Sequence, residues 1–433
     1  MKRNVDVTIS QLAKSGLNQP EKVENFKDLA FGMFVHWSAD CTIGSVISHW
    51  MIGCEEKLID EFVERRARWF DPRYFCAKDL ADLARQCGMK YLCFTAKHHN
   101  GFCMFDTKTT PFNIMNTAYK QDIVAMITRA CRENGIMPGL YFSPLDFYWQ
   151  YCKGRELHFK TPEMLPENNP DLMEYNKKQV AELLNNYGEI GMFFFDGPPV
   201  GLKELVWELQ PGCVITRGEM ETPEQEIPEQ GFQEAWETCH TIGSSWGYKP
   251  YGDKLSSPLQ IIEKLIEVRS KGGNFLLNIY PDPMGRIPEQ IEGILREVGL
   301  YLFFNAEAIY NVRPYRIHRE GNIFFTKAKD EPTVYAFITG RKWDFGIEYG
   351  PTDEDWKEIR FDVTIKSIHI CDKTEVEIVG QSGKVVEHRP RADVKTRFYQ
   401  DETGLHINAL LAMRPQDDRQ WPYPVVFRIT HVM

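Results

Sequence analysis

A chain of 433 residues is too long for one ordinary domain, so we expect two or more domains. Its hydrophobic fraction of 43% and charged fraction of 26% are those of a globular protein with a sizeable core. The formal charge of −10 argues against a nucleic-acid partner, which would need a basic patch, and no apolar run is long enough for a membrane span.

The eleven cysteines are irregularly spaced and include no CxxC pair, which indicates free, reduced thiols rather than disulfides or a zinc site. The N-terminal segment MKRNVDVTISQLAKSG lacks the apolar stretch of a secretory signal. From the chain as given we expect a cytoplasmic protein, or a periplasmic or secreted one if a signal peptide was removed.

The first three hundred residues alternate short apolar runs with amphipathic, helix-like stretches. Strands are predicted at 31–37, 90–97, 137–143, 190–196, 213–218 and 274–281, and helices at 78–88, 122–135, 171–188, 202–212, 257–273 and about 287–303. This alternation is typical of a parallel α/β fold, and one continuous series favours a (β/α)8-like barrel over a doubly wound sheet. No glycine-rich phosphate loop follows a strand, so nucleotide binding is not indicated.

After residue 313 the helix-length patterns disappear, and short β-rich segments follow one another. They cover residues 322–329, 333–340, 358–365, 374–380, 395–400 and 425–432. Evenly spaced short strands are typical of an antiparallel sandwich. We therefore expect an α/β protein in which residues 1–313 form a catalytic (β/α)8-like barrel. Residues 314–433 are then an antiparallel β-sandwich domain that serves packing or stability.

Polar residues follow five of the predicted barrel strands at the point where each strand ends. They are His36; His98 and His99; Tyr141, with Asp146 beyond it; Asp196; and Arg217. Because the C-terminal ends of barrel strands meet at the face where catalytic residues gather, these positions indicate a single site. Taken one at a time, each also has a structural explanation, such as a satisfied histidine, a core tyrosine or a surface arginine.

The adjacent histidines lie within FTAKHHNGFCMFD, residues 94–106. Two imidazoles could ligate a metal, but adjacent side chains on a strand point to opposite faces, and the HxH spacing usual for a metal site is absent. Carboxylates are also sparse around the pair. The pattern therefore favours recognition of sugar hydroxyls over metal binding.

Asp196 directly follows the apolar run GMFFF, where burial of an ionisable group costs free energy unless the group is paired or used. A structural aspartate that caps a loop is the alternative. The acidic loop EMETPEQEIPEQ, residues 219–230, comes after the next strand, and one of its glutamates could face Asp196. Two carboxyl groups about 5–5.5 Å apart are typical of retaining glycosidases, and about 6.5–9.5 Å of inverting ones. The sequence does not fix this distance.

Five segments occur in order between about residues 26 and 313: FGMFVHW, AKHHNGFCMFDTKTTPFNIMNT, GLYFSPLDFYW, FFFDG and SKGGNFLLNIYPDPMGRIP. Together they resemble the α-L-fucosidases of glycoside hydrolase family 29. The resemblance implies a (β/α)8-like catalytic barrel followed by a β-sandwich. It also implies a retaining double displacement, with neither a metal nor an organic cofactor.

Carried over residue by residue, the resemblance implies that Asp196 is the nucleophile. The matches to residues that contact the sugar are His36, His49, Trp50, His98, His99, Tyr141, Phe194 and Arg217. The acid/base glutamate lies in a variable loop of this family. The segment TPEQ is similar to the one that carries it, which selects Glu224, with Glu226 and Glu237 as alternatives.

Three positions depart from the family pattern. His49 stands where glutamate is frequent, Phe194 where tryptophan is common, and Asn100 where the family has aspartate. A neutral histidine offers one acceptor where a carboxylate offers two charged oxygens. His49 therefore argues against strict specificity for fucose.

The prediction is a retaining exo-α-L-fucosidase that hydrolyses terminal α-L-fucosyl residues of an oligosaccharide or glycoconjugate. Two alternatives remain: a hydrolase of a related sugar, such as an α-L-galactoside, and a carbohydrate-binding protein without catalysis. No feature of the sequence indicates the oligomeric state.

Overall fold

The computed structural model describes residues 18–45, 49–158, 161–341, 343, 347–349, 356–382, 393–413, 415 and 421–433. The chain forms two compact units. The first comprises Met1–Ser256 and Gly273–Glu297, and the second comprises Ser257–Gly272 and Val298–Met433.

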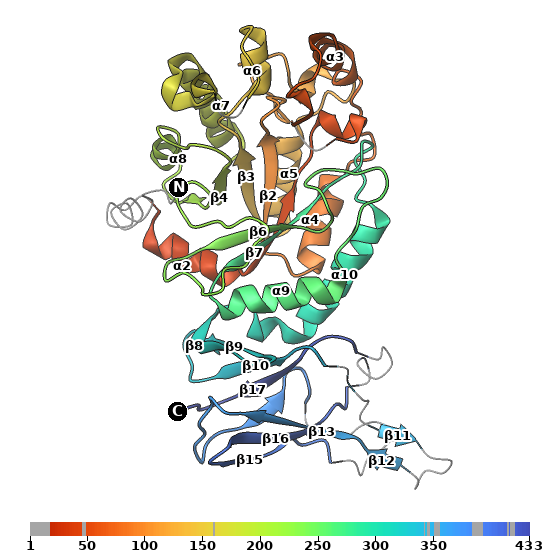
Figure 1. The fold of residues 1–433 in the computed structure, drawn as a ribbon, viewed down its shortest axis with the longest axis vertical. Coiled ribbons are helices and arrows are strands. Elements are labelled where there is room, and N and C mark those ends of the chain that lie inside the picture. Colours follow the sequence, from red (N-terminus) through yellow and green to blue (C-terminus); the bar gives the residue numbers. More distant parts are fainter. Residues whose placement is uncertain are drawn as a thin grey trace. The chain divides into compact units, whose positions relative to one another are not determined.

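The first unit is built on one parallel sheet of seven strands, and Figure 1 shows α4 (Ala77–Gln86) and α5 (Ile123–Glu133) beside it. The strands are β1 (Phe31–Val35), β2 (Tyr91–Lys97), β3 (Met137–Phe142), β4 (Met192–Phe195), β5 (Val214–Ile215), β6 (Glu237–Thr241) and β7 (Asn274–Ile279). Their order across the sheet is β5-β4-β3-β2-β1-β7-β6, and every neighbouring pair is parallel. The predicted parallel, barrel-like α/β fold is confirmed.

A regular eighth strand is missing from the described part of this sheet. Isolated parallel bridges instead join Glu221 to Trp236 and Glu224 to Cys239, beside β6. The segment that follows β5 thus reaches β6, the strand at the opposite edge of the sheet. Its sequence contains glycine, proline and several glutamates, which disfavour a regular strand.

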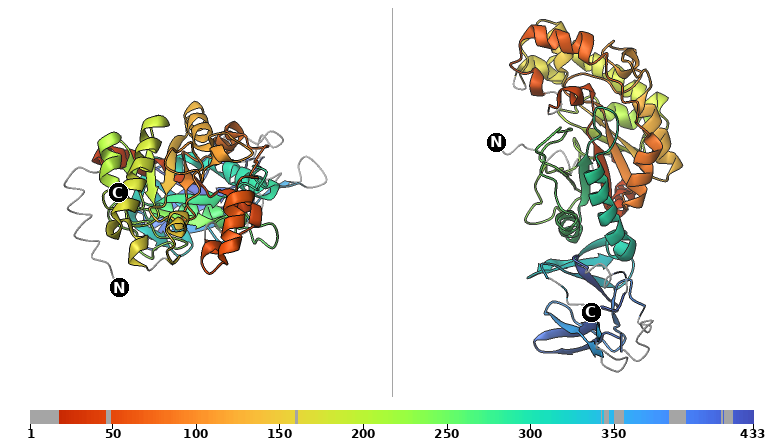
Figure 2. Two further views of the ribbon diagram at one scale, coloured as in Figure 1. Left: turned by 90° about the horizontal axis from the view of Figure 1, so that it is seen from above. Right: turned by 90° about the vertical axis from the view of Figure 1, so that its right-hand side faces the viewer.

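Helices follow the strands along the chain, and Figure 2 shows them from two further directions. They are α2 (Pro20–Leu29), α3 (Glu56–Glu61), α4 (Ala77–Gln86), α5 (Ile123–Glu133), α6 (Phe147–Cys152), α7 (Pro170–Asn186), α8 (Lys203–Leu209) and α10 (Glu289–Asn305). Side-chain caps explain where two of them begin. Asp122 accepts from the N–H of Ala125 at the start of α5, and Asn169 accepts from Leu172 at the start of α7.

Apolar side chains fill the interior of the curled sheet. Strands β1, β2 and β7 are buried along their whole length, as their apolar runs predict. The interior core consists of Phe26, Phe34, Tyr91, Cys93, Tyr141, Met192, Phe194, Val214, Cys239 and Leu276. Because all seven strands contribute to it, the core fixes the positions of the strand ends, where the predicted site residues lie.

The second unit contains helix α9 (Pro258–Ser270) and antiparallel sheets. The five-stranded sheet consists of β8 (Val312–Glu320), β9 (Ile323–Ala328), β10 (Val334–Ile338), β14 (Val376–Ile378) and β17 (Val425–Ile429). The others are β13 (Arg360–Ile365) with β15 (Arg397–Asp401) and β16 (Gly404–Leu410), and β11 (Ile347–Tyr349) with β12 (Trp356–Glu358). The ring of Phe361 on β13 lies 6.0 Å from that of Phe427 on β17, so the two larger sheets share an aromatic core.

All eleven cysteines carry free thiols. Among the described residues, no helix combines the length and the apolar composition that crossing a bilayer requires. The predicted division into domains between residues 313 and 314 does not coincide with the two compact units, which assign α9 to the second unit, and it stays a prediction.

Candidate active site

A cavity of about 210 Å³ opens at the C-terminal ends of the strands in the first unit. Nine of the ten predicted site residues line it: His36, His49, His98, His99, Tyr141, Phe194, Asp196, Arg217 and Glu224. Phe34, Cys239 and Trp246 complete the lining. The structure therefore brings together side chains from five strand ends and from the acidic loop.

A larger groove of about 790 Å³ lies beside α7, but none of the predicted site residues line it. Charged side chains of both signs border this groove, among them Asp171, Glu174 and Lys178, and all three are exposed. The smaller cavity is the stronger candidate, because it gathers buried polar groups with shifted pKa values.

Asp196 lies directly after β4, and three side chains surround its carboxylate. Oδ2 accepts a 2.6 Å hydrogen bond from the Tyr141 hydroxyl and lies 3.4 Å from Nε2 of His99. Oδ1 accepts from Nη1 of Arg217 at 3.2 Å. Burial by itself would raise the pKa of Asp196, but a hydrogen bond from His99 and the charge of Arg217 hold it well below its usual range. The carboxylate is therefore ionised, as a nucleophile must be.

The chain makes a sharp turn immediately after this carboxylate. Gly197 has a φ of 143°, in the region that favours glycine. A Cβ at this position would lie 3.3 Å from the ring of Pro144. The glycine thus lets the chain turn away from the site while Asp196 stays fixed at the end of its strand.

Arg217 contacts both predicted catalytic carboxylates through one nitrogen atom. Its Nη1 donates to Asp196 Oδ1 at 3.2 Å and to Glu224 Oε2 at 2.9 Å. The guanidinium group lies over the Phe194 ring, with 4.8 Å between its central carbon and the ring centroid. The Glu224 side chain is 43% exposed, so this carboxylate borders the solvent side of the cavity. Asp196 and Glu224 therefore face one ligand position from two sides.

The other two candidate glutamates do not line the cavity. Glu226 is exposed on the loop. Glu237 is fully buried at the start of β6, where Oε2 accepts a 2.5 Å hydrogen bond from the Tyr91 hydroxyl. Burial raises the pKa of Glu237 to about 7. Among the three glutamates, the geometry favours Glu224 as the partner of Asp196.

Two buried histidines present opposite hydrogen-bonding groups. Nδ1 of His36 lies 2.6 Å from Oδ1 of Asn278, whose amide nitrogen donates to the Trp246 carbonyl, so His36 donates at Nδ1 and accepts at Nε2. Nδ1 of His98 accepts a 2.9 Å hydrogen bond from the His99 backbone, which places its proton on Nε2. Burial lowers the pKa of His36 to about 3 and that of His98 well below its usual value. Neutral donors and acceptors side by side suit an uncharged ligand with several hydroxyls.

His98, His99 and Asp196 also bring three possible metal ligands within 4.8 Å of one another. Their existing contacts oppose a cation, because Nε2 of His98 carries a proton and Arg217 places positive charge 3.2 Å from Asp196. Hydroxyl recognition fits this donor set better than metal binding does, and the lack of a cofactor stays a prediction.

Trp50 is the one predicted pocket residue that the cavity lining does not include. Its indole N–H donates to the buried carboxylate of Asp40, and its ring lies 4.7 Å from that of Phe62, in a separate apolar cluster. The wall is formed instead by Trp246, whose ring lies 4.9 Å from that of His36. The structure thus adds Trp246 to the pocket wall, and the role of Trp50 as a pocket residue stays a prediction.

Of the three other lining residues, Phe34 lies in the quoted motif FGMFVHW, but sequence reasoning missed Trp246 and Cys239. Trp246 lies in the segment GSSWGYKPYGD, where a single large aromatic among small and polar residues after a strand is a usable signal for a ligand contact. Cys239 lies on β6, with Sγ 3.6 Å from Nη2 of Arg217. No strand was predicted there, because ETCHT has no apolar run.

Comparison with known proteins agrees with this geometry. The sequence profile of one protein family, described as Alpha-L-fucosidase, matches residues 6–307. An Alpha-L-fucosidase from Dictyostelium discoideum is 28% identical over 400 residues, which cover 86% of this chain and 79% of the relative. The Plasma alpha-L-fucosidase of Homo sapiens is 26% identical over 357 residues, which cover 73% of this chain and 76% of the relative.

Solved structures share the fold. Alpha-L-fucosidase isoenzyme 1 from Paenibacillus thiaminolyticus matches with a TM-score of 0.75 at 24% identity, over 95% of this chain and 99% of that one. A structure from Bacteroides thetaiotaomicron matches with a TM-score of 0.72 at 21% identity, over 95% and 96% of the two chains. It is described as a trapped covalent intermediate of a family 29 α-L-fucosidase in complex with 2-fluoro-fucosyl fluoride. Since the family profile covers more than half of the sequence, this chain belongs to the α-L-fucosidase family of glycoside hydrolases, family 29.

Proposed function

We propose that this protein is a retaining exo-α-L-fucosidase, with Asp196 as the nucleophile and Glu224 as the acid/base. The observation that carries the proposal is the shared contact with Arg217, whose Nη1 lies 3.2 Å from Asp196 Oδ1 and 2.9 Å from Glu224 Oε2. Because both oxygens bond the same nitrogen atom, the sum of the two distances is an upper limit for the separation of the two oxygens. This limit lies below the about 6.5 Å at which the carboxyl separations of inverting enzymes begin. The short separation supports direct attack by Asp196 over attack by an intervening water.

The size and lining of the cavity support a single neutral sugar ring as its occupant. Its volume of about 210 Å³ is below the range of about 300–1,000 Å³ that suits drug-sized ligands. The rings of Phe34, Phe194 and Trp246 offer apolar contact for the C6 methyl group of fucose. His36 and His98 supply an acceptor and a donor for its hydroxyls. The proposed substrate is a fucosylated oligosaccharide or glycoconjugate.

In the first step an oxygen of Asp196 attacks the anomeric carbon of the fucosyl residue. The bond from this carbon to the leaving oxygen breaks, and Glu224 gives its proton to that oxygen. The product is a fucosyl ester of Asp196 together with the released alcohol. Arg217 and Tyr141 keep the attacking carboxylate oriented through their hydrogen bonds to its two oxygens.

In the second step Glu224 takes a proton from water, and the water oxygen attacks the anomeric carbon. The bond to Asp196 breaks, which restores both carboxyl groups and releases fucose with its α configuration. The covalent intermediate described for the Bacteroides thetaiotaomicron structure supports the same course here.

The domain assignment belongs to this proposal. Every residue that lines the cavity lies between Phe34 and Trp246, within the predicted catalytic segment 1–313. Residues 314–433 are then the C-terminal β-sandwich, with a role in packing or stability.

The test is the anomeric form of the first product. The enzyme is mixed with an aryl α-L-fucoside, and proton NMR follows the sugar before mutarotation. We expect α-L-fucose first, with no turnover by Asp196→Ala. Early β-L-fucose would show inversion, which contradicts the proposed mechanism. Failure to hydrolyse any aryl α-L-glycoside, with fucose still bound, would leave the carbohydrate-binding alternative.

A related sugar is the second candidate, because His49 lines the cavity at the position where the family often has glutamate. Its ring lies 6.2 Å from that of His99. Comparing kcat/KM for aryl α-L-fucoside and aryl α-L-galactoside decides between the two sugars. A higher value for the galactoside would overturn the fucoside assignment while keeping the hydrolase assignment.

A further inference from the structure

The imidazole of His99 is held on both sides. Nε2 lies 3.4 Å from Oδ2 of Asp196, and Nδ1 forms a hydrogen bond with Oγ of Ser143. A lone pair on Nε2 would repel the carboxylate, so the contact with Asp196 favours a proton on this nitrogen. In a neutral His99 the other nitrogen, Nδ1, must then accept a hydrogen bond.

Ser143 has one hydroxyl proton and two neighbouring acceptors. Its Oγ lies 3.0 Å from the Leu145 carbonyl and also bonds Nδ1 of His99. If the proton points to His99, neutral His99 keeps its proton on Nε2, toward the nucleophile. If the proton points to Leu145, His99 must donate from Nδ1. The neutral ring would then present a bare nitrogen to Asp196.

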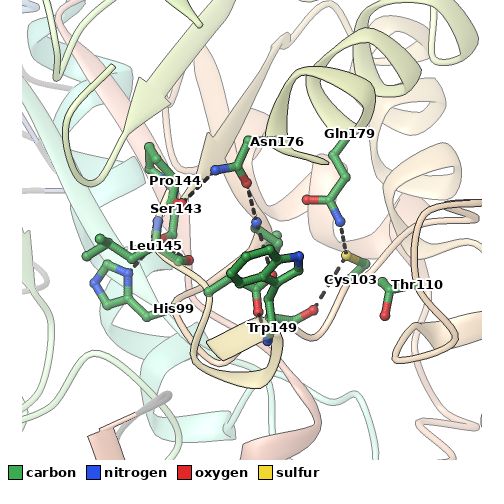
Figure 3. Close-up of polar contacts among 12 residues, drawn as sticks. His99, Cys103, Thr110, Ser143, Pro144, Leu145, Trp149, Asn176 and Gln179 are labelled. Carbon is green, nitrogen blue, oxygen red and sulfur yellow. Dashed lines mark hydrogen bonds and ion pairs between the residues drawn. The ribbon is translucent and has the colours of Figure 1, made fainter. Parts of the chain in front are cut away.

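Backbone hydrogen bonds join the loop that carries Ser143 to the segment that carries His99. The N–H of Ser143 donates to the Lys97 carbonyl at 3.0 Å, and the N–H of Phe147 donates to the His99 carbonyl at 2.7 Å. Asn176, on α7, donates to the Pro144 carbonyl at 2.7 Å, as Figure 3 shows. The position of the Ser143 hydroxyl thus depends on contacts from β2 and from α7.

A buried ion pair supports this loop from behind. Lys97 Nζ lies 3.3 Å from Asp146 Oδ2 and donates to Asn176 Oδ1 at 2.9 Å. Lys97, Asp146 and Asn176 are all fully buried. Gly101, with a φ of 83°, leaves room for the pair, because a Cβ there would overlap Asp146 Oδ1. Burying two charges costs free energy, and apolar side chains would fill the same space without this cost. The ion pair therefore points to a role in positioning the loop of Ser143.

We propose that Ser143, held in place by Asn176 and Lys97, is a positioning residue that sets the tautomer of His99 and so keeps an Nε2–H directed at Asp196. Its effect on turnover rests on the proposed function. The tautomer itself can be measured without any substrate.

The direct test uses protein labelled with ¹⁵N-histidine, with the His99 signals assigned by their loss in His99→Gln. In the wild type at neutral pH we expect the proton of neutral His99 on Nε2. In Ser143→Ala, Nδ1 loses its donor, and we expect a shift toward the Nδ1–H form. Ser270→Ala is the matched control, because Ser270 is also fully buried and donates to a backbone carbonyl, that of Glu267 at 2.7 Å. An unchanged tautomer in Ser143→Ala would overturn the proposal.

The kinetic test uses two buried amides on the same helix. Asn176 and Gln179 are both fully buried, but Gln179 bonds Thr109 and Cys103 rather than the loop of Ser143. We expect Asn176→Ala to lower kcat by up to about 100-fold, with a smaller change in KM, and Gln179→Ala to leave kcat close to wild type. Equal losses in both variants would assign Asn176 a merely structural role and overturn the proposal that it holds Ser143 in place.

Ser143→Thr keeps the hydroxyl and should recover most of the kcat that Ser143→Ala loses. Wild-type kcat in Ser143→Ala would contradict the positioning role. If the wild type hydrolyses neither aryl α-L-fucoside nor aryl α-L-galactoside, the proposed function fails, while the tautomer comparison still decides the role of Ser143.

Discussion

The side-chain amide of Asn100 donates a hydrogen bond to the carboxylate of Asp40, immediately behind the histidine pair. Both side chains are fully buried, and Asn100 Oδ1 accepts from the Phe102 backbone at 2.9 Å, which fixes the orientation of the amide. The family has aspartate in place of Asn100. In this chain an aspartate there would face Asp40, and two buried carboxylates in contact cannot both ionise without a large cost.

Asn100→Asp should therefore make stability depend more strongly on pH. Burial already raises the pKa of Asp40 to about 6, and a second carboxylate would raise the pKa of the pair. The contribution of their shared proton is complete below the unfolded-state pKa of about 4 and is lost as pH rises through the folded-state pKa. We expect Tm to fall more steeply than in the wild type between about pH 5 and about pH 8, measured by calorimetry.

Two variants serve as controls for this measurement. Asn116→Asp makes the same change at an exposed position, the last residue of the 3-10 helix Ile114–Asn116, and should leave the slope unchanged. The double variant Asp40→Asn with Asn100→Asp keeps one carboxylate and one amide and should recover most of the lost stability. Parallel Tm curves for Asn100→Asp and the wild type would contradict the proposed contact.

Glu224→Ala should lose far more activity on a natural glycan than on an aryl fucoside with a good leaving group. General acid–base catalysis contributes about 10²–10⁴-fold, and an aryl leaving group needs little protonation. Azide should restore part of the lost activity and give α-fucosyl azide, because the β-configured ester of Asp196 still forms and azide attacks it from the face that water would use. The measurement is turnover with and without azide, with identification of the product.

Glu226→Ala is the matched control, since Glu226 lies on the same loop but does not line the cavity. It should keep wild-type activity and show no azide product. Asp196→Ala should be inactive on every substrate. If Glu226→Ala is the variant that azide rescues, the acid/base assignment moves to Glu226.

His49→Glu should tighten binding of the fucosyl ring. A carboxylate offers two charged acceptors where neutral histidine offers one, and a hydrogen bond to a charged group contributes about 1.5–3 kcal/mol. We expect KM for an aryl α-L-fucoside to fall by about tenfold or more, while His49→Gln shows no such gain. Identical KM values for the two variants, on both the fucoside and the galactoside, would show that residue 49 does not contact the sugar.

The barrel strands could be predicted because each combines an apolar run with a polar residue at its end. β7 begins at its predicted residue, Asn274, and β4 lies inside the predicted range 190–196, because the burial of both strands is continuous. β6 was missed because a buried glutamate, Glu237, replaces the apolar residue that marks a strand, and only its contact with Tyr91 explains that burial. A contact between residues so far apart along the chain leaves no local signal.

The candidate site likewise contains residues that the sequence could predict and residues that it could not. The predictions for His36, His98 and Asp196 rest on their places at strand ends, and all three line the cavity. Trp246 and Trp50 could not be ranked from the sequence, since Trp246 lies in a loop and Trp50 in the short 3-10 helix His49–Met51. Trp50 donates to the buried carboxylate of Asp40 rather than lining the cavity. Loop residues depend on contacts distant in sequence, whereas strand ends are fixed by the periodicity of the barrel.

The last prediction concerns the buried carboxyl group of Glu237. Burial raises its pKa to about 7, against about 4.3 in an unfolded chain. The folded protein therefore holds this proton more tightly. The stability that the proton contributes is complete below about pH 4 and is lost as pH rises to about 7, a total of about 4 kcal/mol.

Glu237→Gln should remove this pH dependence, because glutamine is uncharged at every pH and its carbonyl oxygen can still accept the hydrogen bond from Tyr91. We expect the free energy of unfolding of the variant to decline less than that of the wild type between about pH 5 and about pH 7, so that the two curves converge or cross. Urea denaturation at several pH values measures this difference. Glu226→Gln, the same change at an exposed position, should follow the wild-type curve. If Glu237→Gln also runs parallel to the wild type, Glu237 does not titrate in this range, and the stability of the barrel interior does not depend on its proton.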